Sequence, residues 1–170
     1  MKPAVRFPGL LIALALASAV PAPADDATQP PILIGRTRPS TILSIAPGWT
    51  AEHDRYRPAA ADLPVIAAAP RNATIDVYFG SWCGDSRRGV PHFLRILEAT
   101  PDTRIKVRYY GVDRTKKEPA GLLAGVGLVK VPTFVYKVGG REVGRIVESP
   151  DTTLEHDLAL LIARTPPAAP

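Results

Sequence analysis

The chain has 170 residues, which is enough for one ordinary domain with additions and short of two full domains. Hydrophobic residues make up 46% of it, so a core can form, and 21 basic against 16 acidic side chains give a mild net charge of +5. Because charges of both signs are interspersed and no long basic run carries interleaved aromatic residues, the composition argues against nucleic acid as a partner.

The first 24 residues have the pattern of a secretory signal peptide. A basic start with Lys2 and Arg6 precedes an apolar run over residues 10–20 that is too short for a comfortable membrane span. Small residues with two A-x-A cleavage sites follow. We expect residues 1–24 to be removed, which leaves a net charge of +3 on a periplasmic or secreted protein without stable membrane insertion. The alternative is an uncleaved N-terminal anchor.

Export has a direct consequence for the cysteine chemistry. Exported proteins meet an oxidising compartment in which cysteines commonly pair. Cys83 is the single cysteine of the sequence, so it cannot form an internal disulfide. It is an inert buried thiol, a reactive free thiol, or half of an intermolecular bond.

The segment after the signal peptide, residues 25–73, is predicted to be a linker and an N-terminal extension. It begins polar and proline-rich, and residues 32–45 hold short apolar bursts suited to edge strands or extended chain. Short helices are predicted at 50–57 and 59–69. Since the apolar residues are too scattered to bury a core alone, we expect this extension to pack on the domain that follows.

The stretch from residue 74 to residue 163 alternates between strand and helix patterns. The predicted elements are, in order, a strand at 74–80, a helix from Cys83 to about Ala99, a strand at 104–112, a short helix near 120–124, strands at 133–138 and 141–147, and a helix from Ser149-Pro150 onward. Gly139 and Gly140 supply the positive φ angles of a tight turn between the last two strands. Residues 164–170 are expected to form a disordered tail. The order predicts an α/β fold whose mixed sheet is parallel in its first half, ends in an antiparallel hairpin and is flanked by helices.

Three motifs in residues 74–163 coincide. Trp82-Cys83 follows a strand and opens a helix, Pro91 lies eight residues after the cysteine, and Val131-Pro132 directly precedes the hairpin. Together they resemble the thioredoxin superfamily, and the W-C-G-D-S run is similar to that of an exported bacterial branch with a single-cysteine CxxS motif. The resemblance implies a thioredoxin-like fold in which a cis peptide bond before Pro132 faces the thiol.

The sequence departs from the family pattern at the residues that would complete the exchange. Ser86 stands where the resemblance places a second, resolving cysteine, and Asp85 stands where a proline is usual. Val77 occupies the position at which relatives often carry a buried acid that relays protons. Asp76 is one residue away, and strand alternation should turn it to the opposite face. The means of resolving a mixed disulfide are therefore missing in two places.

The predicted position of Cys83 also has physical consequences of its own. A thiol at a helix N-terminus faces free backbone N–H groups and the positive end of the helix dipole, and both favour the thiolate. Arg87 adds positive potential or is simply solvated, and Asp85 opposes it. Ser86 can donate a hydrogen bond to the sulfur but cannot attack a disulfide, and a plain helix-start role for it is weighted equally.

These considerations give one set of candidate site residues. The predicted catalytic residues are Cys83 and Ser86, the substrate-binding residues are Trp82, Val131 and Pro132, and the residues that tune the thiol are Asp85 and Arg87. We expect no metal, since three scattered histidines and one cysteine lack metal-ligand spacing, and no cofactor.

Three functions remain open from the sequence. The first is an exported monothiol protein that exchanges disulfides through Cys83, with an external thiol releasing the mixed disulfide. Its partners would be protein thiols or disulfides or a small thiol, and it would act as a monomer. The second is a redox-inactive thioredoxin-fold module that binds peptides or acts like a chaperone. The third, a peroxide-reactive thiol that passes through sulfenic acid, ranks last because no supporting base is evident.

Overall fold

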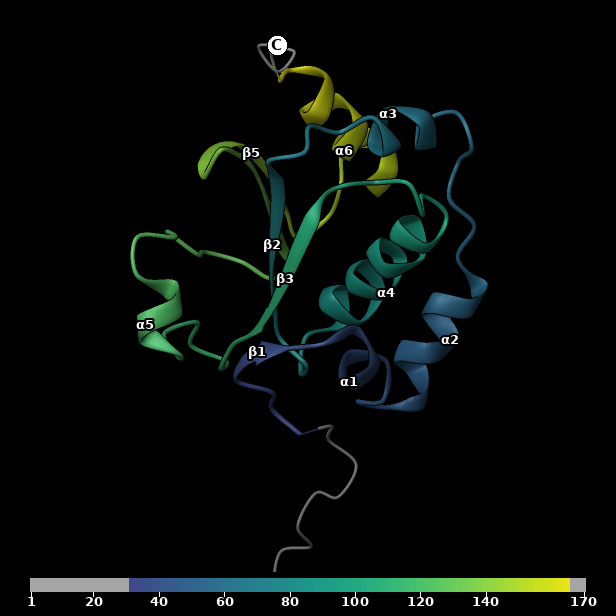
Figure 1. Ribbon diagram of the computed structural model, residues 1–170. Helices are drawn as coiled ribbons and strands as arrows, with labels where there is room; N and C mark the ends of the chain where they lie inside the picture. Colours follow the sequence, from purple (N-terminus) through teal and green to yellow (C-terminus); the bar gives the residue numbers. More distant parts are fainter. Residues whose placement is uncertain (1–30, 166–170) are drawn as a thin grey trace, which may run out of the picture.

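The computed structural model describes residues 31–165. The expected signal peptide and residues 166–170 of the expected tail lie outside the described residues. A five-stranded mixed sheet runs through the described part and carries helices on both faces (Figure 1). No helix between residues 31 and 165 is both long enough and apolar enough to cross a membrane.

The sheet has the strand order β1-β3-β2-β4-β5. Its strands are β1 (Gly35–Thr37), β2 (Ala73–Phe79), β3 (Lys106–Gly111), β4 (Thr133–Val138) and β5 (Arg141–Val147). β2 and β3 run parallel, whereas β4 is antiparallel to both β2 and β5. The predicted mixed sheet with a C-terminal hairpin is therefore confirmed, and β1 adds an antiparallel edge strand on β3. Gly139 and Gly140 turn the hairpin with φ angles of 58° and 81°.

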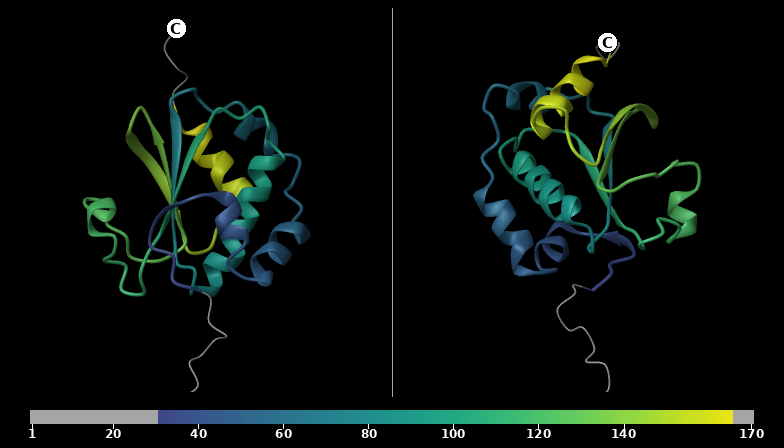
Figure 2. Two further views of the ribbon diagram at one scale, coloured as in Figure 1. Left: turned by 60° about the horizontal axis from the view of Figure 1, so that its bottom comes forward. Right: turned by 180° about the vertical axis from the view of Figure 1, so that it is seen from behind.

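Most helices cover one face of this sheet. They are α1 (Pro39–Leu43), α2 (Pro47–Arg55), α3 (Leu63–Ala67), α4 (Gly84–Glu98), α5 (Ala120–Leu123) and α6 (Leu154–Ala163). Figures 1 and 2 show α4 and α6 against one face, α1 and α2 outside α4, and α5 on the opposite side. In this arrangement the N-terminus of α4 lies next to the C-terminal end of β2.

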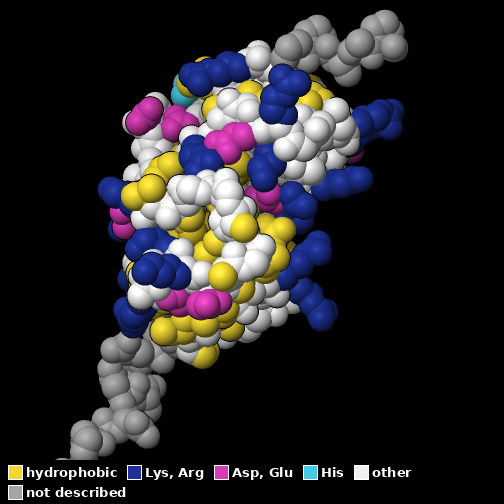
Figure 3. All heavy atoms as spheres, turned by 90° about the vertical axis from the view of Figure 1, so that its left-hand side faces the viewer, with side chains coloured by type: hydrophobic (Ala, Val, Ile, Leu, Met, Phe, Trp, Pro, Cys, Tyr) yellow, Lys and Arg dark blue, Asp and Glu magenta, His cyan; other side chains and the backbone are white. Residues whose placement is uncertain are grey.

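The main core lies between the sheet and α4 and α6. Val77 of β2, Val90 and Phe93 of α4, and Leu158 of α6 are all buried in it. A smaller cluster on the other face includes Tyr78, whose ring stacks on that of Tyr110 at 5.1 Å between centroids. Figure 3 looks onto this second face, where basic side chains are spread with acidic ones between them.

The segment before β2 is joined to the core by buried contacts. Trp49 of α2 is 1% exposed and meets Phe79 edge-on, with ring centroids 5.8 Å apart. Glu155 of α6 is also buried and accepts hydrogen bonds from the Ala59 N–H and the Tyr56 hydroxyl. Although burial opposes its ionisation, these bonds hold the pKa of Glu155 below its usual range. This buried carboxylate therefore joins the extension to the last helix through both of its oxygens.

Three helix starts differ from the positions that the sequence predicts, since α3 begins at Leu63 and not at residue 59, and two of them have a local cause. α6 begins at Leu154, later than the Ser149-Pro150 pattern indicates, because the Thr153 side chain accepts a backbone hydrogen bond from the first turn and caps it there. α2 begins at Pro47, ahead of Thr50, whose hydroxyl donates to the backbone of α1 instead of capping a helix.

The buried indole of Trp49 yields a test of the extension's role. We expect Trp49→Ala to lower the free energy of unfolding by about 3–5 kcal/mol, because it leaves a cavity against Phe79. Arg55→Ala, an exposed change on the same helix, should cost within about 0.5 kcal/mol. Denaturant titration of both variants measures this, and equal small losses would mean that α2 contributes nothing to the core.

Candidate active site around Cys83

The turn between β2 and α4 sets the position of Cys83. Its backbone N–H donates to the Gly80 carbonyl at 2.9 Å, and its own carbonyl accepts the first helical hydrogen bond, from Arg87, at 3.0 Å. Cys83 is thus the N-cap residue of α4, with extended backbone angles of −94° and 128°. The free thiol belongs to a partly exposed residue at the mouth of the helix.

The thiol lies beside the loop that leads into β4. Cys83 Sγ donates to the Val131 carbonyl oxygen at 3.3 Å, and the Val131–Pro132 peptide bond is cis. The Pro132 carbonyl in turn accepts the Glu148 N–H at 2.7 Å, which ties this loop to the end of β5. Because Val131 and Pro132 are both buried, the groups that they present next to the sulfur are mainly backbone.

Two features adjoin the sulfur. Cys83 caps the N-terminus of α4, a helix of 15 residues. The Val131 carbonyl accepts a hydrogen bond from the thiol, and this bond would have to break before the thiol could donate to another group.

Ser86 has a different partner from the one that its spacing suggests. Its side chain is fully buried, and its Oγ accepts the backbone N–H of Gly80 at 3.1 Å. The bond joins the end of β2 to the first turn of α4. Ser86 consequently acts on the geometry of the turn that presents Cys83, and this favours the structural interpretation of the residue.

Trp82, the residue before Cys83, is half-buried and its ring is held by two contacts. Its Nε1–H donates to the Val112 carbonyl at 3.0 Å, and the Arg114 guanidinium lies 5.4 Å from the ring centroid. A Cβ at Gly80 would approach the indole to 2.6 Å, so a larger residue at that position would force the ring or the turn to shift.

The two residues predicted to tune the thiol have other partners. Asp85 pairs with Arg88 at 3.7 Å, one turn along α4. The Arg87 side chain lies against α2, where a Cβ at Gly48 would meet its Cδ at 3.4 Å. Neither contact directs a charge at the sulfur.

Sequence reasoning missed an ion pair that borders the same loop. Lys130, which directly precedes Val131, donates to the Glu148 carboxylate, and this bond raises the pKa of Lys130. A basic residue next to the Val131-Pro132 motif was the available signal. The partner could not be inferred, because it lies on a loop eighteen residues further along the chain.

The position beneath the thiol carries no proton-relay acid. Val77 is fully buried in the main core, and Asp76 faces the other side of the sheet, as strand alternation predicts. There Asp76 accepts hydrogen bonds from Arg108 at 2.6 and 2.9 Å and from Lys137 at 2.9 Å. The Asp76 carboxylate is therefore paired within a cross-strand network away from Cys83.

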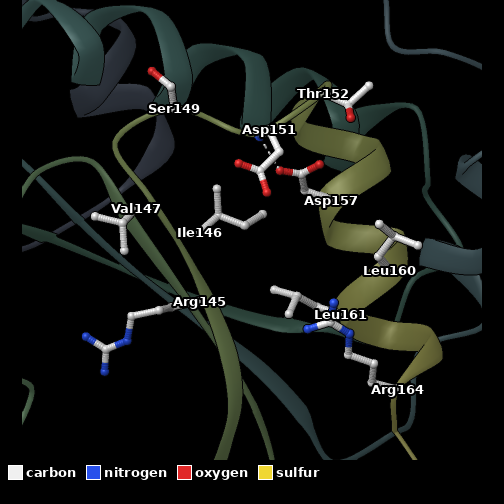
Figure 4. A pocket seen from close by; sticks show the side chains of 10 residues that line it. All are labelled: Arg145, Ile146, Val147, Ser149, Asp151, Thr152, Asp157, Leu160, Leu161 and Arg164. Carbon is white, nitrogen blue, oxygen red and sulfur yellow. Dashed lines mark hydrogen bonds between the residues drawn. The ribbon is translucent and has the colours of Figure 1, made fainter.

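Within residues 31–165, no group of three or more His, Cys, Asp or Glu side chains converges on a possible metal position. A hollow of about 370 Å³ between β5 and α6 has carboxylates at one end and arginines at the other (Figure 4). Asp157 accepts the Asp151 N–H there, and Arg145 is held by Glu142 and the Val126 carbonyl. None of the predicted site residues lines this hollow.

His92 lies further along α4 and faces the extension. Its ring stacks on Tyr56 with centroids 3.8 Å apart, and its Nε2 lies 3.4 Å from a Glu52 carboxylate oxygen. Burial lowers the pKa of His92 from its ordinary value of 6.5, although the Glu52 carboxylate opposes this shift. The ring also lines a cavity of about 320 Å³.

Comparisons with known proteins agree with the fold. No known protein-family profile matches the chain. A thioredoxin-like protein of Acanthamoeba polyphaga mimivirus is 28% identical over 81 residues, which are 48% of this chain and 56% of that protein. Mitochondrial thioredoxin 3 of Saccharomyces cerevisiae is 27% identical over 78 residues, 46% of this chain and 57% of its own length. The chain thus spans little more than half of each of these relatives.

A solved structure extends the comparison to most of the described chain. A protein of unknown function from Pseudomonas aeruginosa superposes with a TM-score of 0.56 at 16% identity, and covers 76% of this chain and 91% of the other. This likeness concerns the fold alone. The mixed sheet, the helix mouth at Cys83 and the named relatives together support a thioredoxin-like fold.

The lowered pKa of His92 gives a prediction with a definite sign. The unfolded chain binds a proton at this residue more readily than the folded one, so the stability from neutral His92 is present above about pH 6.5 and is lost as the pH falls below it. His92→Phe can keep the stack on Tyr56 but does not titrate. The stability of the wild type relative to His92→Phe should therefore decrease between about pH 7.5 and about pH 5.5 in denaturant titrations. A difference that grows in acid would contradict the assignment.

The spacing of Cys83 and Ser86 predicts the outcome of a second substitution. Residues three apart at a helix start lie within disulfide range, so Ser86→Cys should form an internal disulfide under mild oxidation. Arg87→Cys is the matched control, because its side chain is directed at α2. Mass spectrometry after alkylation counts the free thiols. Two free thiols in oxidised Ser86→Cys would show that the turn does not bring the positions together.

Proposed function

We propose that this chain, with its thioredoxin-like fold and one thiol at the mouth of α4, is a monothiol protein that carries out thiol-disulfide exchange. The observation that carries the proposal is the position of Cys83 Sγ, at a helix N-terminus and 3.3 Å from the Val131 carbonyl beside cis-Pro132. The names of the relatives, a thioredoxin-like protein and a thioredoxin, support the same reaction class.

The exchange needs only one protein thiol. The Cys83 thiolate attacks one sulfur of a substrate disulfide, the S–S bond breaks, and the departing thiolate takes a proton from solvent. Cys83 is then joined to the substrate by a new disulfide. Because Ser86 has no sulfur, the thiolate of an external thiol attacks the substrate sulfur of this bond and releases Cys83.

The neighbouring residues position the substrate and the nucleophile. The Val131 carbonyl lies beside the sulfur and can accept a hydrogen bond from an extended substrate chain. Ser86 holds the turn that carries Cys83, and the ring of the neighbouring Trp82 is anchored on the Val112 carbonyl. Asp85 and Arg88 add a mutually paired charge at the rim.

The setting of the reaction follows from the sequence. The basic and apolar start of the chain supports export and cleavage near residue 24, with action in the periplasm or outside the cell. Protein thiols or disulfides, or a small thiol, are the partners that this chemistry requires. On the face shown in Figure 3 the charges are mixed and form no continuous basic surface, which does not favour nucleic acid.

One contact favours the alternative, a redox-inactive module that binds peptides. Cys83 Sγ donates a hydrogen bond to the Val131 carbonyl, and a thiol that keeps this bond would suit binding without turnover. The two functions differ in whether Cys83 accelerates disulfide exchange.

A disulfide-reduction assay separates them. Reduction of insulin by a small monothiol should be accelerated by the wild-type protein and should fall to the rate of the small thiol alone with Cys83→Ser. Without the small thiol, the wild type should stop after one substrate per molecule. No acceleration over the small thiol would reject the exchange function in favour of the binding module.

A further inference from the structure

A cavity of about 320 Å³ opens next to the candidate active site, on the side of Pro132. Four elements enclose it: α4, the beginning of β4, the connection from β5 to α6, and the residue that follows α2. Its principal wall residues are Tyr56, Gly89, His92, Phe134 and Leu154.

The cavity and the thiol flank the same two loop residues. A Cβ on Gly89 would lie 3.2 Å from Pro132 Cγ and 3.7 Å from the Phe134 ring, so Pro132 packs against this wall. Glu148 also lines the cavity, and its N–H donates to the Pro132 carbonyl. On the other side, Cys83 Sγ contacts the Val131 carbonyl. A chain bound across Val131-Pro132 therefore leads from the sulfur into the cavity.

The buried part of the cavity is lined by apolar side chains. Phe134 and Leu154 are 3% and 4% exposed and form an apolar floor. Two polar atoms of the stacked rings have partners outside the cavity lining, since the Tyr56 hydroxyl donates to Glu155 and His92 Nε2 faces Glu52.

The rim is polar but its charges are balanced. Asp85 pairs with Arg88, and Glu148 pairs with Lys130. The rim therefore offers no net charge to attract a small anionic or cationic ligand into the cavity. The cavity can therefore select a ligand by its size and by its apolar surface.

Resting on the proposed exchange function, we propose that this cavity is a specificity pocket for a large apolar side chain, preferably aromatic, on the residue next to the substrate cysteine. Asp85, two residues after Cys83, and Gly89, which packs against Pro132, both line the cavity, so it lies close to the reacting sulfur. The volume, at the lower end of ligand pockets, suits one aromatic side chain. Small thiols without such a side chain would leave it empty.

The pocket also gives the N-terminal extension a part in recognition. Tyr56 belongs to the extension, and its ring completes the wall that His92 begins. The extension thereby shapes the substrate site in addition to burying core residues.

Activated peptides test the pocket apart from the general chemistry. The probes are acetyl-Ala-Cys-Ala-amide and its variants with Phe before or after the cysteine, each joined to thionitrobenzoate by a disulfide. Cys83 attacks the peptide sulfur, the S–S bond breaks, and coloured thionitrobenzoate leaves. We expect one of the two Phe peptides to react about 10-fold faster than the alanine peptide at low concentration.

Two matched variants locate the preference. Ser149→Trp places an indole at the rim and should reduce the Phe-to-Ala rate ratio to near one. Asp151→Trp changes an exposed residue of the same connection that lines the neighbouring hollow and not this cavity, so it should keep the wild-type ratio.

Each result has a distinct meaning. If wild-type Cys83 releases thionitrobenzoate from none of the peptides, the exchange function itself fails. If all three peptides react at equal rates, the exchange function stands and the specificity pocket is overturned. A Phe preference that survives in Ser149→Trp, or is lost equally in Asp151→Trp, also overturns the assignment to this cavity.

Discussion

The hydrogen bond from the Gly80 N–H to the buried Ser86 hydroxyl holds the end of β2 against the first turn of α4, and the position of Cys83 depends on it. A hydroxyl is a stronger hydrogen-bond acceptor than a thiol, and in this buried turn it satisfies a backbone donor that would otherwise be unpaired. The serine thus replaces a possible second sulfur with a fixed structural bond. Under the proposed function, Cys83 is then the single nucleophile of the turn, and resolution comes from outside the chain.

The same turn orients the surroundings of the thiol. Gly80 leaves room for the Trp82 indole, which is anchored on the Val112 carbonyl. The Val131 carbonyl contacts the sulfur, and Pro132, the next residue, packs against Gly89 in the wall of the cavity.

The parts of the structure that depend on local pattern could be predicted from the sequence. The β-rich run of β2, helical spacing in α4 and the Gly139-Gly140 turn predicted the mixed sheet and its hairpin. The start of α6 could not be placed from Ser149-Pro150, because two good cap patterns compete there and Thr153 makes the hydrogen bond.

Features that join distant parts of the chain could not be predicted from local sequence patterns. β1 pairs with β3 across more than sixty residues of intervening chain, and the Glu155 contacts reach back to Tyr56 and Ala59. Ser86 and Arg87 were correctly placed in the first turn of α4, but their contacts depend on Gly80 and on α2. The cavity beside Pro132 is built from four separate elements, so no local sequence motif predicts it.

The central claim is that Cys83 forms a mixed disulfide that this chain cannot resolve. Intact-mass spectrometry of the protein after reaction with a disulfide-linked peptide, under acid quench, tests it most directly. We predict one peptide adduct on Cys83 that persists through prolonged incubation and is discharged when a small thiol is added. Absence of an adduct, or its disappearance without added thiol, would contradict the account.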